Sequence, residues 1–143
     1  MTKTRRTARI LALAVPVAVV LAMSIAWAAP PAAPKFLELG KGPTIVLVHE
    51  LGGNRMTWMP TAKKLVGRHR VVLVDLPGHG GSPLPDPFTL EAAAEALDQV
   101  LALQNPDSTV IVGKGLGGML SLMALKAHPG RARGLVLVET GLK

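Results

Sequence analysis

Short apolar runs alternate along this chain with segments of helical periodicity. Each run is five or six residues long and rich in Val, Ile and Leu, which is typical of strands buried on both faces of a sheet. The runs fall at residues 44–49, 70–75, 109–113 and 134–139, and an alternating segment at 35–39 predicts a first strand. Helices are predicted between them, up to about residue 66, from 89 to about 103, and at 117–127. This order predicts an α/β fold with a parallel, doubly wound sheet of about five strands.

The segment from Thr89 to about Leu103 carries the clearest helix signals. Its leucines at positions 90, 97 and 101 fall on one face at helical spacing, which is typical of an amphipathic helix. Thr89 stands where its hydroxyl can cap the first turn. We therefore expect the helix to begin directly after Thr89.

The N-terminal segment predicts export. Its first nine residues contain four basic side chains and no acid, and residues 10–29 carry no charge. Small residues then form an Ala-Trp-Ala cleavage site at 26–28, so residues 1–28 read as a signal peptide. The alternative is an uncleaved membrane anchor, because twenty apolar residues can span a bilayer. A proline-rich spacer at 29–34 would then precede a single domain at 35–143. We expect an exported protein, periplasmic or extracellular, or one anchored in the membrane by its N-terminal segment.

Charge and composition exclude several kinds of partner. The net charge of +7 falls to +3 without residues 1–28, since twelve basic and nine acidic residues remain. These bases are scattered and are not interleaved with aromatic residues, so we do not expect nucleic acid as a partner. Cysteine is absent, which excludes disulfides and thiolate metal sites. We predict neither a metal site nor a cofactor.

A glycine-rich turn follows the run at 109–113 and fits two different active-site motifs. The sequence IVGKGLGG places glycine at positions 113, 115, 117 and 118. It fits the nucleophile elbow G-x-S-x-G with Gly115 in the place of the serine. It also fits the dinucleotide loop G-x-G-x-x-G through Gly113, Gly115 and Gly118, with Glu139, 21 residues further on, as the ribose-binding acid. Replacing the serine of G-x-S-x-G-G by glycine creates the second spacing automatically.

Three stretches together resemble the α/β-hydrolase family. They are VLVHELGGNRMTW (46–58), VVLVDLPGHGGSP (71–83) and IVGKGLGG (111–118), in the family's order and each at the end of a predicted strand. The likeness runs from about Lys35 to the end of the chain. It implies an incomplete α/β-hydrolase fold, the N-terminal half only.

The resemblance implies roles for several positions. The backbone N–H groups of Leu51 and Leu116 would form the oxyanion hole, and a serine at position 115 would be the nucleophile. The family's histidine follows the last strand, beyond residue 143. Its acid follows the seventh strand, or in some members the sixth, where Glu139 stands as a candidate acid or as a solvated carboxylate.

The chain departs from the family pattern at the site itself. Gly115 has no functional side chain, and Lys114 replaces the usual histidine. Glu50 replaces the glycine after His49 and so puts a carboxylate where negative charge should develop, which opposes oxyanion stabilisation.

We expect structural roles for the remaining polar residues of these motifs. His49 and His79 would hydrogen-bond the backbone and shape the loops. Asp75 would brace the loop that follows it.

We therefore expect an exported hydrolase of ester or related bonds, truncated and catalytically impaired, in effect a pseudoenzyme. One alternative is a non-catalytic module that binds a small apolar, ester-like ligand, and another is a dinucleotide-binding unit. A membrane would be a partner only through residues 10–29, and a second polypeptide that completes the sheet is a further candidate partner.

Overall fold

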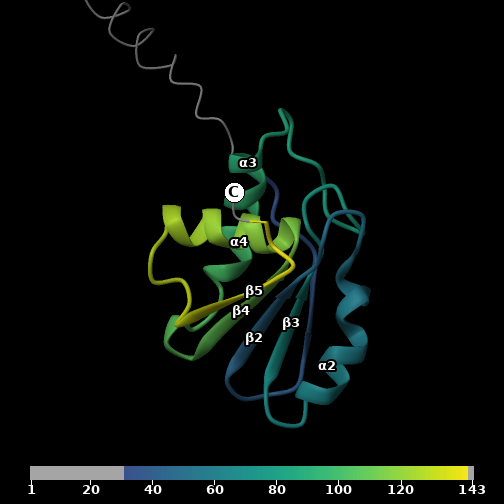
Figure 1. Cartoon of the computed structure of the whole chain (residues 1–143), viewed down its shortest axis with the longest axis vertical. Coiled ribbons are helices and arrows are strands. Elements are labelled where there is room, and N and C mark those ends of the chain that lie inside the picture. Colours follow the sequence, from purple (N-terminus) through teal and green to yellow (C-terminus); the bar gives the residue numbers. More distant parts are fainter. Residues whose placement is uncertain (1–30, 142–143) are drawn as a thin grey trace, which may run out of the picture.

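The computed structural model describes residues 31–141, which form a five-stranded sheet with helices on both faces (Figure 1). The strands are β1 (Phe36–Leu39), β2 (Thr44–Val48), β3 (Arg70–Val74), β4 (Thr109–Lys114) and β5 (Gly134–Val138). Their order in the sheet is β1-β3-β2-β4-β5. The predicted α/β fold class is therefore confirmed.

One strand differs from the parallel arrangement that we predicted. β2, β3, β4 and β5 are parallel neighbours, with Val46 opposite both Val72 and Ile111, whereas β1 pairs antiparallel with β3. In that pairing Phe36 lies opposite Val74. The sheet is thus mixed, with an antiparallel strand at one edge, which is common in large α/β sheets.

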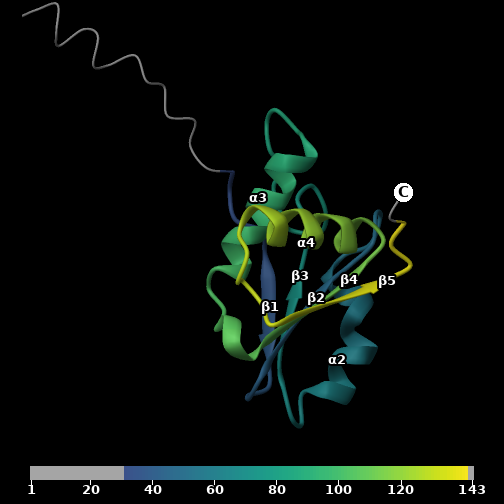
Figure 2. The same ribbon diagram turned by 60° about the vertical axis from the view of Figure 1, so that its left-hand side comes forward.

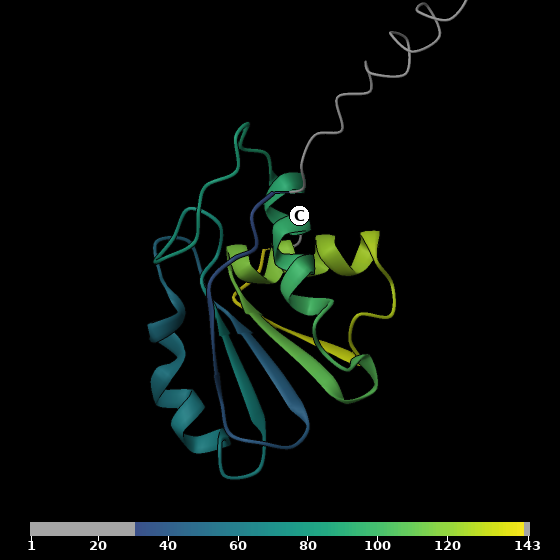
Figure 3. The same ribbon diagram turned by 180° about the vertical axis from the view of Figure 1, so that it is seen from behind.

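The helices form two layers. A 3₁₀ turn, η1 (Arg55–Trp58), and α2 (Met59–Leu65) cover one face, and α3 (Leu90–Leu101) and α4 (Leu116–Ala127) cover the other (Figures 2 and 3). A short 3₁₀ turn, η2 (Pro106–Ser108), leads into β4. Helices on both faces make the sheet doubly wound, as predicted.

The core is split by the sheet into two parts, because successive side chains of a strand point to opposite faces. Val46, Val72 and Ile111 pack toward α3 and α4, while Leu47 and Leu73 pack toward Ala62 of α2. All five strand side chains are essentially buried. This explains why the strands read as continuous apolar runs and not as alternating ones.

The start of α3 agrees with the sequence only in part. Thr89 caps the helix, since its Oγ1 accepts a hydrogen bond from Ala92 N–H at 3.0 Å. Leu97 and Leu101 are buried as their spacing suggests. Leu90 is 38% exposed, because it is the first residue of the helix and lies at its open end.

The predicted signal peptide at 1–28, and with it the alternative anchor at 10–29, lies outside the described residues. Of the spacer, Pro31 accepts a hydrogen bond from Gln99 through its carbonyl oxygen, and Pro34 is buried. Between residues 31 and 141, no helix combines the length and the hydropathy needed to cross a membrane.

Candidate active site

The candidate site lies where the loops after β2 and β4 meet, at the carboxyl ends of the parallel strands. Ligands of open α/β sheets bind at this edge. The loop after β2 carries Glu50 and Leu51, and the turn after β4 carries Gly115 and Leu116. The two loops pack closely: a Cβ atom at Gly117 would lie 2.4 Å from the carbonyl oxygen of His49.

Gly115 adopts the backbone conformation of a strained strand-to-helix turn. Its φ of 50° and ψ of −119° lie in a region that side-chain-bearing residues rarely adopt. Its N–H donates to the carbonyl oxygen of Val138 at 2.9 Å, and it directly precedes α4. A nucleophile elbow places its nucleophile on such a turn.

The neighbouring glycines are required by close packing. A Cβ atom at Gly113 would lie 2.5 Å from the Cα of Gly118, and one at Gly118 would lie 2.1 Å from Thr140 Oγ1. Position 115 differs, because its nearest neighbours would be the Cβ of Glu50 at 3.3 Å and the Cα of Glu50 at 3.8 Å. Packing thus accounts for Gly113 and Gly118 of the dinucleotide pattern. Among the four glycines of this turn, only Gly115 leaves space for a Cβ atom, and that space is tight.

Lys114 joins two carboxylates beside the turn. Its Nζ lies 3.7 Å from Glu50 Oε1 and 3.4 Å from Glu139 Oε2. Glu139, at the end of β5, is 74% exposed, as expected for a solvated carboxylate. The second oxygen of Glu50, Oε2, is buried and has no hydrogen-bond partner among residues 31–141. The sequence predicted that Glu50 lies beside the site, but it did not reveal these ion pairs.

Leu51 and Leu116 are held on neighbouring segments of this site. Leu116 is the first residue of α4, so its N–H has no acceptor within the helix. Leu51 lies in the turn that Gly53 N–H closes by donating to the carbonyl oxygen of Glu50 at 3.1 Å. The side chain of Leu51 is 72% exposed. A leucine side chain has no polar atom, so the only polar groups at these two positions belong to the backbone.

His49 and His79 use both ring nitrogens to hold loops. His49 Nδ1 bonds the carbonyl oxygen of Glu50 at 2.7 Å, and its Nε2 accepts from Leu76 N–H at 2.9 Å. Burial lowers the pKa of His49, more than the hydrogen bond to Glu50 raises it. His79 Nε2 accepts from Gly52 N–H at 3.2 Å, and its Nδ1 bonds Pro77 O at 3.0 Å. Neither ring has a nitrogen left for a substrate.

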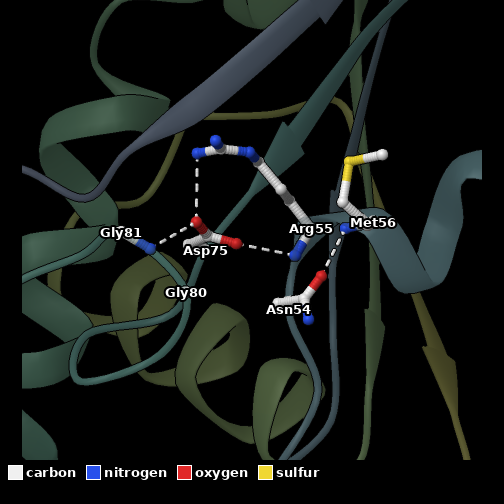
Figure 4. Close-up of a pocket in the computed structure, with 6 residues that line it drawn as sticks. All are labelled: Asn54, Arg55, Met56, Asp75, Gly80 and Gly81. Carbon is white, nitrogen blue, oxygen red and sulfur yellow. Dashed lines mark hydrogen bonds and ion pairs between the residues drawn. The ribbon is translucent and has the colours of Figure 1, made fainter.

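Asp75 braces two loops beside a shallow pocket (Figure 4). Its Oδ1 accepts from Arg55 N–H at 2.7 Å, and its Oδ2 accepts from Arg55 Nη1 at 3.0 Å and Gly81 N–H at 2.9 Å. The pocket measures about 300 Å³ and is lined by Asn54, Arg55, Met56, Asp75, Gly80 and Gly81. The carboxylate is fully engaged, so it supports the loops as expected. Its partner Arg55 was not predicted from the sequence.

Glu95, Asp98 and His128 form a second polar cluster, with ligand-type atoms all within 4.8 Å of one another. Arg131 already binds both oxygens of Asp98, through Nε at 2.8 Å and Nη2 at 2.9 Å. The hydrogen bond to Asp98 raises the pKa of Arg131. Because His128 follows α4, this cluster lies about 18 Å along the helix from Gly115. It joins α3 to the loop after α4 and takes no part in the candidate site.

Comparison with known proteins identifies the family. The alpha/beta hydrolase fold model matches residues 43–142. A pimeloyl-(acyl-carrier protein) methyl ester esterase of Pseudoalteromonas atlantica is 36% identical over 111 residues, which are 76% of this chain and 42% of that protein. The same esterase of Chromobacterium violaceum is 38% identical over 106 residues, 73% of this chain and 40% of its own.

Solved structures agree with this result. A marine microorganism esterase superposes with a TM-score of 0.68 at 30% identity, covering 74% of this chain and 41% of its own. An esterase from Rhodococcus superposes with a TM-score of 0.68 at 27% identity, covering 77% of this chain and 45% of its own. This chain thus spans about two fifths of the length of the curated relatives it matches. The matched residues 43–142 and the similar structures together place the chain in the α/β-hydrolase fold family.

Proposed function

We propose that this chain is an esterase-type hydrolase that binds a small, apolar carboxylic ester at the turn between β4 and α4. The observation that carries the proposal is the backbone of Gly115, which keeps the strained turn of a nucleophile elbow. The relatives named as esterases support a carboxylic ester as the substrate class.

In this proposal the N–H groups of Leu51 and Leu116 receive the carbonyl oxygen of the ester. Backbone donors of this kind stabilise the charge that develops on the oxygen when the carbonyl carbon is attacked. Close packing of Gly117 against the loop after β2 holds the two donor segments together. The arrangement would therefore bind the tetrahedral intermediate better than the ground-state ester.

We also propose that no covalent acyl-enzyme forms at residue 115. Gly115 offers no nucleophile, and the rings of His49 and His79 are occupied by backbone groups. Positioning and oxyanion contacts alone sustain about 10³–10⁴-fold acceleration over water in enzymes without their triad. We therefore propose a catalytically impaired esterase, with pure ligand binding as its limiting case.

Export by residues 1–28 is also a proposal. It rests on the basic start, the uncharged segment at 10–29 and the small residues at 26–28. A second polypeptide that pairs with the sheet edge at β5 is a further proposed partner; Val136 of that strand is 48% exposed.

Two variants at position 116 test the proposed site. Proline is tolerated at the first position of a helix and removes the N–H donor, so Leu116→Pro should delete one oxyanion contact and keep α4. Leu116→Ala loses the same side-chain packing and keeps the donor, which makes it the matched control. The probe is 1-(4-nitrophenyl)pentan-2-one, the ketone isostere of p-nitrophenyl butyrate.

We expect the ketone to raise the Tm of the wild type and of Leu116→Ala, and to leave that of Leu116→Pro unchanged, because ligand binding stabilises the folded state. A fluorophosphonate probe should label none of the three proteins. Equal stabilisation of all three would exclude the N–H of Leu116 as a donor. No stabilisation of the wild type would remove the proposed site altogether.

A further inference from the structure

The Cα and Cβ of Glu50 lie beside the position from which a nucleophile would attack. A Cβ atom at residue 115 would lie 3.3 Å from the Cβ of Glu50, so the two positions face each other across the site. Among residues 31–141, and apart from the sequence neighbours Lys114 and Leu116, no other side chain comes within 4 Å of that point. Glu50 is therefore the group best placed to act on a molecule that occupies the place of a serine hydroxyl.

The two oxygens of this carboxylate have different surroundings. Oε1 faces Lys114, whose Nζ lies 3.7 Å away. Oε2 is buried and has no donor among residues 31–141. Buried carboxylate oxygens in proteins normally accept hydrogen bonds, and an unsatisfied one often marks a functional role. Because Oε2 is closed to water in this conformation, it can take a donor from a water molecule at the serine position only when the side chain of Glu50 turns toward residue 115.

We propose that Glu50 is the general base of this site and activates a water molecule for direct attack on the bound ester. The inference rests on the proposed function, because it takes the ester as already held by Leu51 and Leu116. Water activated by Glu50 attacks the ester directly and no acyl-enzyme forms, so Gly115 leaves room for the water in place of a side chain.

The reaction balances without any further reactant. The oxygen of water forms a bond to the carbonyl carbon, the carbonyl π electrons move onto the carbonyl oxygen, and one proton of the water passes to Glu50. When the tetrahedral intermediate collapses, the bond to the alkoxy oxygen breaks and that oxygen takes the proton from Glu50. The products are a carboxylic acid and an alcohol, and Glu50 is a carboxylate again.

Proton transfer also removes the electrostatic objection to a carboxylate at position 50. A negative Glu50 beside a negative oxyanion would oppose catalysis. In this sequence of events Glu50 becomes neutral as the oxyanion forms, so one negative charge moves across the site and two never coexist. The N–H groups of Leu51 and Leu116 then meet the only negative charge among the reacting groups.

Other titratable groups near the turn are less suited to the role. Glu139 is 74% exposed and meets Lys114 through Oε2 at 3.4 Å. His49 and His79 have both ring nitrogens engaged by the backbone. Lys114 contacts Oε1 of Glu50 and so leaves Oε2 for the water; it acts as a positioning residue.

The experiment measures hydrolysis of p-nitrophenyl butyrate by the full chain and by Glu50→Gln, which keeps the shape of the side chain and removes the base. We expect kcat to fall about 10²–10⁴-fold in Glu50→Gln, the range for a lost general base, with little change in KM. Glu95→Gln is the matched control, because Glu95 is an exposed carboxylate on α3 that pairs with His128. Its kcat and KM should equal those of the wild type.

Chemical rescue separates a base from a structural residue. Glu50→Gly creates space, and added sodium formate should restore hydrolysis in a concentration-dependent way, because formate supplies a small carboxylate. Formate should not change the rate of the wild type or of a Glu95→Gly variant. Circular dichroism and the Tm of each variant establish that the fold is kept.

The outcomes separate the two proposals. Stabilisation by the ketone isostere in both wild type and Glu50→Gln, together with loss of kcat in Glu50→Gln and rescue of Glu50→Gly, supports the general base. Ketone binding with wild-type hydrolysis no faster than in buffer, or with unchanged kcat in Glu50→Gln, overturns it and leaves the binding site standing. Failure of the wild type to bind the ketone removes the proposed function, and the role of Glu50 with it.

Discussion

Glu50 and Gly115 form a steric pair: a side chain at residue 115 would begin 3.3 Å from the Cβ of Glu50. Such a contact is tighter than most Cβ contacts, so one of the two residues must shift when a side chain is added. The resemblance to α/β hydrolases puts a glycine at position 50 and a serine at position 115. The two departures therefore fit each other, and a side chain added at residue 115 would affect Glu50.

This pairing predicts that Gly115→Ser alone is destabilising by about 1–3 kcal/mol, because a non-glycine residue at φ 50° is strained and its Cβ meets Glu50. Glu50→Gly should recover part of that loss. Urea unfolding of the two single variants and the double variant measures the coupling. Gly130→Ser is the control, since Gly130 has a φ of 92° and no neighbour within 4 Å of an added Cβ. Equal costs for Gly115→Ser with and without Glu50 would contradict the pairing.

The buried His49 predicts a loss of stability in acid. Burial lowers the pKa of the folded-state ring below its ordinary value of 6.5. The unfolded chain therefore binds a proton below about pH 6.5 before the folded protein does, and this favours unfolding as the pH falls toward the folded-state pKa. Above pH 6.5 the ring is neutral in both states, so the packing and hydrogen bonds of His49 contribute fully to the stability of the folded protein. The slope is at most about 1.4 kcal/mol per pH unit.

Urea unfolding between pH 8 and pH 5 measures this effect. His49→Gln should be less stable at every pH and should show a shallower decline below pH 6.5. If the two proteins decline in parallel, His49 does not cause the acid sensitivity.

Substitution of Asp75 should lower the free energy of unfolding more than substitution of its partner Arg55. Asp75→Asn puts an amide where the carboxylate accepts three hydrogen bonds, and should cost about 3 kcal/mol. Arg55→Gln removes only the half-exposed guanidinium and keeps the backbone N–H, so we expect about 1 kcal/mol. Hydrogen exchange of the Gly81 N–H should accelerate much more in Asp75→Asn. A greater loss in Arg55→Gln would show that the guanidinium carries most of the stabilisation.

The cluster of Glu95, Asp98 and His128 with Arg131 contains two ion pairs that should contribute differently to the free energy of unfolding. Arg131→Gln leaves the buried carboxylate of Asp98 without its bidentate partner and should cost about 2–3 kcal/mol. Glu95→Gln changes an exposed pair with His128 and should stay within about 0.5 kcal/mol. Thermal unfolding at neutral pH compares the two. Similar losses would mean that burial of Asp98 is unimportant.

The sequence predicted the parallel part of the sheet well, because strands buried on both faces leave a clear apolar signal. It did not predict the antiparallel pairing of β1. β1 is only four residues long and precedes β2 by a short turn, yet it pairs with β3, more than thirty residues away. The pairing depends on the position of β3 in the sheet, and the local sequence pattern of β1 does not specify that position.

The candidate site, like the sheet, could be predicted from the sequence only in part. The backbone of Gly115 and the roles of His49 and Asp75 followed from motifs, since these residues act through local loop geometry. The bond from Arg55 to Asp75 spans 20 residues, and Lys114 reaches Glu50 and Glu139 from a different strand. Such contacts depend on the conformations of long side chains, and a sequence pattern does not determine those.

The close approach of Gly113 to Gly118 has an evolutionary consequence. It fixes the strand and the helix on either side of the turn, so the direction of the Cα–Cβ bond at residue 115 is set by the scaffold, whatever residue stands there. Serine, cysteine or aspartate at this one codon would present a hydroxyl, a thiol or a carboxylate to the same point in space. A single substitution at residue 115 therefore changes which functional group is presented at that point, while the strand and the helix on either side keep their places.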